Sequence, residues 1–146
     1  MIPKSINTPI TTIELVNEPS KTYYLDMKNN RVVGFTDGLE AIKQAIYLML
    51  NTERYEYVIY SWNYGLETFD LYGKDMNYVI SEVQRRITEA LLTDSRITSV
   101  SDFNFERNRH KLQVTFIAHT IYGDVDNSTE VIINGVWEYN IRNVIR

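Results

Sequence analysis

Apolar and polar side chains alternate along residues 111–121, and this pattern limits the fold more than any other feature of the sequence. Leu112, Val114, Phe116 and Ala118 fall on one side of an extended chain. Successive side chains of a β-strand point to opposite faces of a sheet. The segment therefore predicts a strand with one buried face, and a buried face needs a covering layer of helices or of a second sheet.

Two segments with helical periodicity can supply that layer. The first covers residues 37–51 and begins with a capping-box pattern, in which Asp37 is the N-cap and Glu40 reaches back. The second covers residues 75–93. Their apolar stripes consist of Leu39, Ile42, Ile46, Met49 and Leu50 in the first segment and of Val79, Val83, Ile87, Ala90 and Leu91 in the second.

The charged residues of the second helical segment are expected to face solvent. Glu82 and Arg86 form an i,i+4 pair in the favoured order, which is worth a few tenths of a kcal/mol. We assign the pair to a solvated helix face.

Further strand patterns lie on both sides of the helices. Residues 22–26 and 31–35 predict a small hairpin with a turn at residues 28–30. Residues 54–62 are apolar or aromatic on both faces, which predicts a strand covered on both sides. Residues 96–105 predict another strand.

The last part of the chain also has β character. Residues 129–133 and 136–141 flank Asn134-Gly135, a dipeptide typical of a type I′ hairpin turn. The stretch from Asp124 to Glu130 is rich in Asp, Asn and Ser and is expected to form a turn.

Together these segments predict one α+β domain, with two main helices packed on a mostly antiparallel β-sheet. All three prolines lie within residues 1–20, which predicts an extended N-terminal arm. Residues 21–146 would then form the domain.

Composition argues against several classes of function. The net charge of −4 disfavours a nucleic-acid partner, which calls for a basic stripe. The chain has no cysteine and only two histidines, His110 and His119, so no metal site is expected. No segment has the roughly 20 apolar residues that span a bilayer, and no secretory h-region is seen at the N-terminus, so neither membrane insertion nor export is expected.

No phosphate-binding loop, dinucleotide fingerprint or nucleophile elbow occurs, so we expect no cofactor and no catalytic residues. Paired carboxylates can support glycoside hydrolysis. Glu53, Glu56, Glu67 and Asp70 are candidates, but nineteen acidic residues make chance pairs common.

The run DGLEAIKQAIYLMLNTERYEYVIYSWNYG, residues 37–65, resembles the short baseplate proteins of PBSX-type defective prophages and related contractile tails. The resemblance covers residues 19–105 well and the C-terminal strands more loosely. The group is similar to a wider family of baseplate wedge proteins with the historical name of tail lysozyme.

That wider family carries a Thr-Glu-Arg segment after its first helix and then a Tyr-Gly pair. The residues in these motif positions are Thr52, Glu53, Arg54, Tyr64 and Gly65. An acid-Pro-Arg-Ile motif follows the second helix of the family.

The matching stretch here runs from Asp94 to Ile97, and it lacks the proline and has a shorter acid. We expect Glu53 to pair with Arg96, or Arg54 with Asp94, in a structural ionic contact near the helix ends.

The resemblance implies a non-enzymatic subunit of the inner baseplate that initiates the contractile sheath by β-strand exchange. Expected partners are the baseplate wedge proteins, the tail sheath protein and the tail tube or hub proteins. The chain would act first in the bacterial cytoplasm and then in a phage-like particle. Trp137, Tyr139 and Ile141 are candidate partner contacts, unless their hairpin merely closes the domain's own sheet.

Two other functions stay open from sequence alone. A peptidoglycan hydrolase would clear a zymogram, and a DNA-acting protein would bind DNA in a salt-dependent manner.

Overall fold

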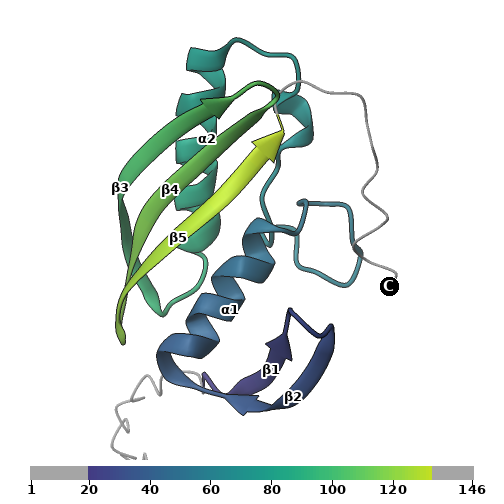
Figure 1. Cartoon of the computed structure of the whole chain (residues 1–146), viewed down its shortest axis with the longest axis vertical. Coiled ribbons are helices and arrows are strands. Elements are labelled where there is room, and N and C mark those ends of the chain that lie inside the picture. The colour runs from purple at the N-terminus through teal and green to yellow at the C-terminus, as the bar shows by residue number, and fades with distance from the viewer. Residues whose placement is uncertain (1–19, 133–146) are drawn as a thin grey trace, which may run out of the picture.

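The structure, a computed structural model, describes residues 20–132 and contains two α-helices and two antiparallel sheets in that range (Figure 1). The elements in chain order are β1 (Thr22–Asp26), β2 (Arg31–Thr36), α1 (Gly38–Leu50), the 3₁₀ turn η1 (Phe69–Leu71), α2 (Met76–Leu91), β3 (Ile97–Asn108), β4 (Lys111–Thr120) and β5 (Gly123–Ile132). The predicted α+β domain is confirmed. The predicted arm and the hairpin around Asn134-Gly135 lie outside the described residues, so the domain boundary at residue 20 stays a prediction.

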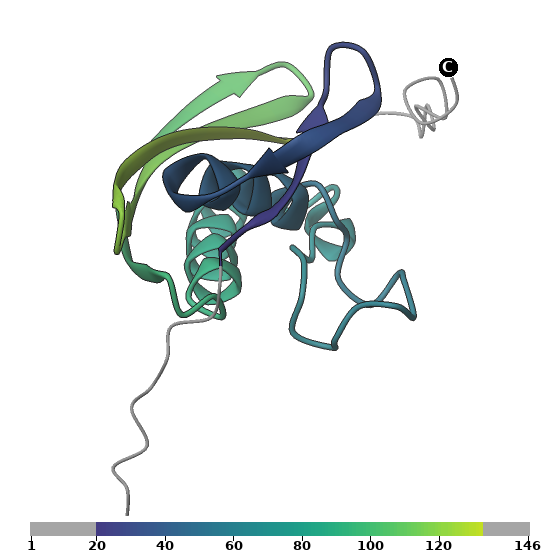
Figure 2. The same cartoon turned by 90° about the horizontal axis from the view of Figure 1, so that it is seen from below.

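The three-stranded sheet has the order β3-β4-β5, and all its strands are antiparallel. The alternation along residues 111–121 correctly predicts β4, whose apolar face is buried. The neighbouring strand β5 adds Val125 and Val131 to that face. The helices cover this one face of the sheet (Figures 1 and 2).

Both helices were predicted correctly, with boundaries close to those observed. Asp37 caps α1 by accepting a hydrogen bond from the backbone N–H of Gly38, at 2.7 Å. Asp75 caps α2 by accepting from Asn77, at 3.0 Å. Glu40 does not complete the expected capping box and instead accepts a hydrogen bond from Lys43.

One apolar core joins the helices to the sheet. Its buried residues include Ile42 and Ile46 of α1, Val83 and Ile87 of α2, and Phe116 of β4. Burial of such side chains contributes roughly 1.5–3 kcal/mol each. The core therefore holds α1, α2 and the sheet together as a single unit.

The predicted hairpin of β1 and β2 is confirmed, and it packs on α1 through Gln44. The Gln44 side-chain amide donates to the carbonyl of Tyr23 and accepts from the N–H of Leu25, both at 2.8 Å. These bonds resemble those of a neighbouring strand. They satisfy part of the outer edge of β1, which would otherwise be open to pairing.

The expected turn at residues 124–130 is wrong, because these residues belong to β5. Two residues, Ile121 and Tyr122, are enough to connect β4 to β5. Val125 and Val131 of β5 are buried, and the five residues between them are all acidic or polar. An edge strand with one solvated face can be as polar as a turn, so composition alone does not distinguish the two.

The predicted strand at residues 54–62 is also wrong, because these residues form an exposed loop. Tyr55 has φ +70°, which ends any extended conformation at the start of the segment. Val58 is 101% exposed and Trp62 77% exposed. Aromatic residues on both faces indicate a covered strand only if the fold supplies neighbours, and within residues 20–132 it supplies none here.

Candidate functional site

Residues 52–54 and 65–66 lie side by side and close the exposed loop, and we call them the neck. The N–H of Leu66 donates to the carbonyl of Thr52 at 2.9 Å, and the N–H of Arg54 donates to the carbonyl of Leu66 at 3.2 Å. Glu53 and Leu66 form a parallel β-bridge. The loop between them, residues 55–64, is called the aromatic loop below. Its adjoining ends give it the form of an Ω-loop.

The two charged residues of the neck make local contacts. The Glu53 carboxylate accepts hydrogen bonds from the N–H and the hydroxyl of Thr68, both at 2.7 Å, and from the N–H of Phe69 at 3.2 Å. The Arg54 guanidinium donates to the carbonyl of Gly65 at 3.2 Å. Glu53 thus fixes the start of η1, and Arg54 holds the returning chain.

Asp94 and Arg96 pair with each other in the turn before β3. The Arg96 guanidinium donates to the Asp94 carboxylate at 2.9 and 2.6 Å, which lowers the pKa of Asp94. The structure therefore gives Glu53 and Arg54 partners other than the expected Arg96 and Asp94. Glu53 and Arg54 contact residues 65–69, whereas Asp94 and Arg96 contact each other. A structural role for these four residues stays a prediction.

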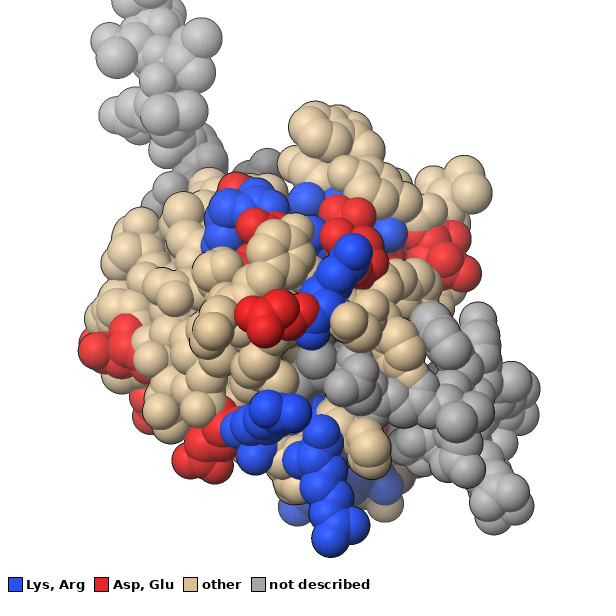
Figure 3. Space-filling view, turned by 90° about the horizontal axis from the view of Figure 1, so that it is seen from above, with Lys and Arg blue, Asp and Glu red and all other residues tan. Residues whose placement is uncertain are grey.

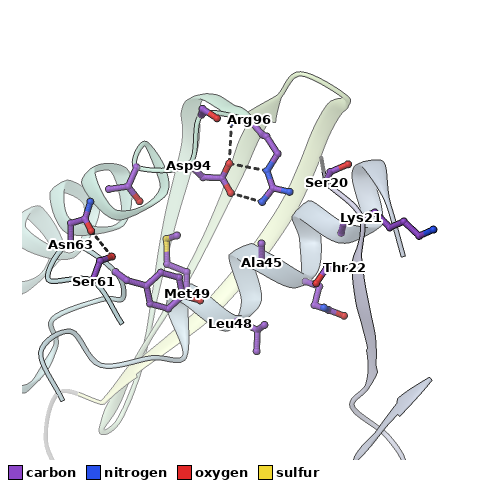
Figure 4. A pocket seen from close by; sticks show the side chains of 15 residues that line it. Ser20, Lys21, Thr22, Ala45, Leu48, Met49, Ser61, Asn63, Asp94 and Arg96 are labelled. Atoms are coloured by element: carbon purple, nitrogen blue, oxygen red, sulfur yellow. Dashed lines mark hydrogen bonds and ion pairs between the residues drawn. The ribbon is translucent and has the colours of Figure 1, made fainter. Parts of the chain in front are cut away.

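A groove of about 670 Å³ separates this turn from the aromatic loop (Figure 4). α1 contributes Gln44, Ala45 and Leu48 to its lining, and Lys21, Asp94 and Arg96 line it from other segments. The groove therefore combines apolar and polar side chains with charges of both signs.

Tyr64 anchors the aromatic loop to the domain. It packs against the core, and burial raises the pKa of its hydroxyl. Its ring stacks on Tyr60 with centroids 4.5 Å apart, and Tyr57 meets Tyr60 edge-on at 6.2 Å. Such aromatic contacts are each worth about 0.5–1.5 kcal/mol beyond area burial. The loop is therefore braced by a row of aromatic contacts that begins at Tyr64.

Arg86 of α2 lies inside the molecule, contrary to the solvated face expected for it. Its side chain is 10% exposed and forms a two-fold ion pair with Asp70 of η1, at 2.5 and 2.7 Å. It also donates to the carbonyl of Glu67 and to the carboxylate of Glu82, at 2.9 and 3.1 Å. Arg86 thus ties the segment after the neck to α2. Of these contacts, only the one with Glu82 could be predicted from the sequence, through its i,i+4 spacing.

Ser101, His119 and Asp124 form a hydrogen-bonded row across β3, β4 and β5. His119 Nε2 lies 2.8 Å from the Ser101 hydroxyl, and Nδ1 lies 2.7 Å from the Asp124 carboxylate. A catalytic triad has the same order of groups. However, the Ser101 hydroxyl also donates to Asp102 at 2.9 Å, and a carboxylate beside the nucleophile opposes the negative charge of an oxyanion. We interpret the row as a cross-strand connection.

Within residues 20–132, no helix could span a membrane. The same residues contain no cluster of three or more side chains suited to holding a metal ion.

The family of the chain follows from comparison with known proteins. Residues 19–123 match the family described as contractile injection system sheath initiator. The chain belongs to this family. It is also 40% identical over 115 residues to the phage-like element PBSX protein XkdS of Bacillus subtilis strain 168, covering 76% of this chain and 82% of that relative.

The resemblance inferred from residues 37–65 is thereby confirmed. The matched range contains both helices, the neck, β3 and β4. The chain is a sheath initiator of the contractile injection system baseplate.

Proposed function

We propose that this sheath initiator starts sheath assembly by pairing the outer edge of β5 with a strand of a sheath subunit. The observation that carries the proposal is the open sheet, because β5 pairs with β4 alone among residues 20–132. A free strand edge presents unpaired N–H and C=O groups and can accept another strand. This mode of recognition is β-augmentation.

The register identifies which groups of β5 are available. Thr120 and Gly123 close a two-residue connection, so they form a hydrogen-bonded pair. Bonded pairs then recur at every second position, which places Asn127 and Thr129 among the residues that bond to β4. The backbone groups of the intervening residues, including Ser128, point away from β4.

β5 is a better edge than β3 for such pairing. Its register with β4 is unbroken from Gly123 to Ile132. The register of β3 shifts between Ser101 and Asn104, where Asp102 has φ +53°. A bulge of this kind interrupts an edge and hinders continuous pairing.

Charge indicates what kind of strand fits. The solvent-facing side of β5 carries Asp124, Asp126 and Glu130 and no Lys or Arg. Opposite charges on neighbouring strands favour pairing, and like charges oppose it. The incoming sheath strand is therefore expected to carry basic residues on the same face.

Figure 3 shows acidic and basic side chains intermixed on one end of the molecule. Mixed charge suits contacts with other proteins better than a phosphate backbone, which favours a continuous basic surface. This fits partners among the wedge, sheath and tube or hub proteins.

The proposal is tested with baseplates isolated from producing cells that lack this chain. Purified sheath subunits are mixed with these baseplates, and sheath growth is followed by electron microscopy and light scattering. Growth should begin only after the full chain is added back. Equal growth without the chain would overturn a role in initiation.

A further inference from the structure

The tip of the aromatic loop presents apolar side chains to water. Val58 is 101% exposed, Ile59 85% and Trp62 77%. Loops of soluble proteins are usually polar, and large exposed apolar patches mark interaction sites. Three such side chains within five residues form a concentrated apolar surface.

The loop is held in shape rather than loosely attached. The neck closes its two ends with backbone hydrogen bonds, and the rings of Tyr57, Tyr60 and Tyr64 contact one another along the loop. A surface already fixed in its binding conformation loses less conformational entropy on association. Trp and Tyr are enriched among interface hot spots, and Trp62 is the most exposed aromatic side chain of this loop.

Charge restricts what can cover the tip. Residues 57–62 contain no charged side chain, and the Glu53 and Arg54 charges next to the tip are engaged in the neck. Glu56 leaves the loop base acidic. Binding to an anionic membrane surface needs Lys or Arg beside the apolar residues, and the loop offers none that is free.

A second copy of the chain is also a poor match. The groove beside the loop is lined in part by Lys21 and by the Asp94–Arg96 ion pair. Inserting an uncharged tip there would bring apolar side chains against these charged groups, and the removal of water from charged groups is costly.

We propose that Val58, Ile59 and Trp62 insert into a concave, uncharged, apolar pocket of a different protein subunit of the baseplate. The loop lies on the side of the helices away from the β3-β4-β5 sheet (Figure 2). The sheath initiator would then use two separate surfaces, the β5 edge for the sheath and the aromatic loop for its seat in the baseplate. The inference rests on the family assignment and goes beyond the strand-pairing proposal.

The first test measures binding of the labelled full chain to baseplates isolated from cells that lack it. The variants are Trp62→Ala and the double variant Val58→Ser, Ile59→Ser, and the matched control is Val32→Ser, an apolar residue of β2 that is 59% exposed. We expect each loop variant to bind roughly 30-fold more weakly or worse and the control to bind normally. Unchanged binding of the loop variants would overturn the proposal.

Photo-crosslinking keeps the proposal testable if a variant fails to fold. Benzoylphenylalanine replaces Trp62 in producing cells, and crosslinked peptides from assembled particles are identified by mass spectrometry. Crosslinks to apolar residues of another baseplate subunit support the proposal. Crosslinks only to copies of this chain, or none in particles that contain it, would overturn it.

Lipid binding provides a further outcome. Vesicles of phosphatidylglycerol and phosphatidylethanolamine are expected not to bind the full chain, and binding that Trp62→Ala abolishes would point to a membrane and contradict the proposal. The loop proposal and the β5 proposal can be refuted independently. A chain altered only at the β5 edge should still bind baseplates, whereas a chain altered only in the loop should not bind them.

Discussion

Gly65 lies so close to Thr52 that a Cβ atom on Gly65 would stand 2.6 Å from the Thr52 carbonyl oxygen. Its φ of +96° is also a conformation that favours glycine. This contact is where the two sides of the neck meet. The glycine of the Tyr-Gly motif is therefore required by backbone geometry, and it allows the aromatic loop to close.

Gly65→Ala should destabilise the chain by about 3 kcal/mol or more, because steric overlap adds to backbone strain. Gly73→Ala is the control, since Gly73 has φ +73° but no atom within 4 Å of the added Cβ. Strain alone should cost about 1–2 kcal/mol there. Urea unfolding of both variants measures the difference, and equal losses would refute the steric role of the neck.

Glu53→Gln should lower the free energy of unfolding by about 1–2 kcal/mol, because hydrogen bonds to a charged acceptor are worth more than neutral ones. Both carboxylate oxygens of Glu53 accept hydrogen bonds from Thr68 or Phe69, and glutamine keeps only one oxygen, which is uncharged. Glu56→Gln is the matched control at an exposed position of the neighbouring aromatic loop. A Glu53 variant as stable as the Glu56 variant would show that the carboxylate does not hold η1.

Arg86→Met should lower the free energy of unfolding by about 2–3 kcal/mol. The loss is smaller than for a fully buried ion pair, because the Asp70 side chain is 48% exposed. Arg85→Met, one position away, removes a 51% exposed side chain paired with Glu82 and Glu89. Exposed ion pairs contribute little to stability, because solvent and salt screen them. Thermal and urea unfolding of the two variants provide the comparison, and a similar loss in both would contradict the buried role of Arg86.

Stability should fall in acid through the aspartates that arginines hold ionised. Hydrogen bonds from Arg86 lower the pKa of Asp70 below its ordinary value of 3.8, and Arg96 does the same for Asp94. The unfolded chain then binds protons at a higher pH than the folded chain. The stabilisation is present above the ordinary pKa and is lost as the pH falls through the lowered one.

Asp70→Asn should therefore be less stable than the unaltered chain at pH 7, and the gap should narrow below about pH 4. Urea unfolding at several pH values measures this. A gap that stays constant across the whole range would show that Asp70 adds no pH-dependent stability.

Local periodicity was enough to predict α1, α2 and β4, because each buries one regular face. The β1–β2 hairpin is largely exposed, and its prediction depended on strand-forming residues on both sides of a turn. It failed at residues 54–62, where alternation cannot reveal whether neighbouring strands exist. It failed again at Asp124, because an edge strand with a polar face resembles a turn.

The site was predicted in part. The motif residues Thr52, Glu53 and Gly65 were singled out from the family resemblance, but their role as a loop neck depends on contacts between segments distant in sequence. The burial of Arg86 depends on Asp70, sixteen residues earlier, and no local pattern connects them. The candidate contacts Trp137, Tyr139 and Ile141 lie outside the described residues and stay predictions.

The outer edge of β5 is tested most directly by removing one outward N–H. Ser128→Pro removes the N–H that points away from β4 and leaves the bonds between β4 and β5 in place. Ser128→Ala keeps the N–H and serves as the control. Circular dichroism and baseplate binding first establish that both variants fold and dock.

Sheath growth is then measured on baseplates carrying each variant. We predict normal growth from Ser128→Ala and little or no growth from Ser128→Pro. Equal growth from the two folded, docked variants would contradict initiation through the β5 edge.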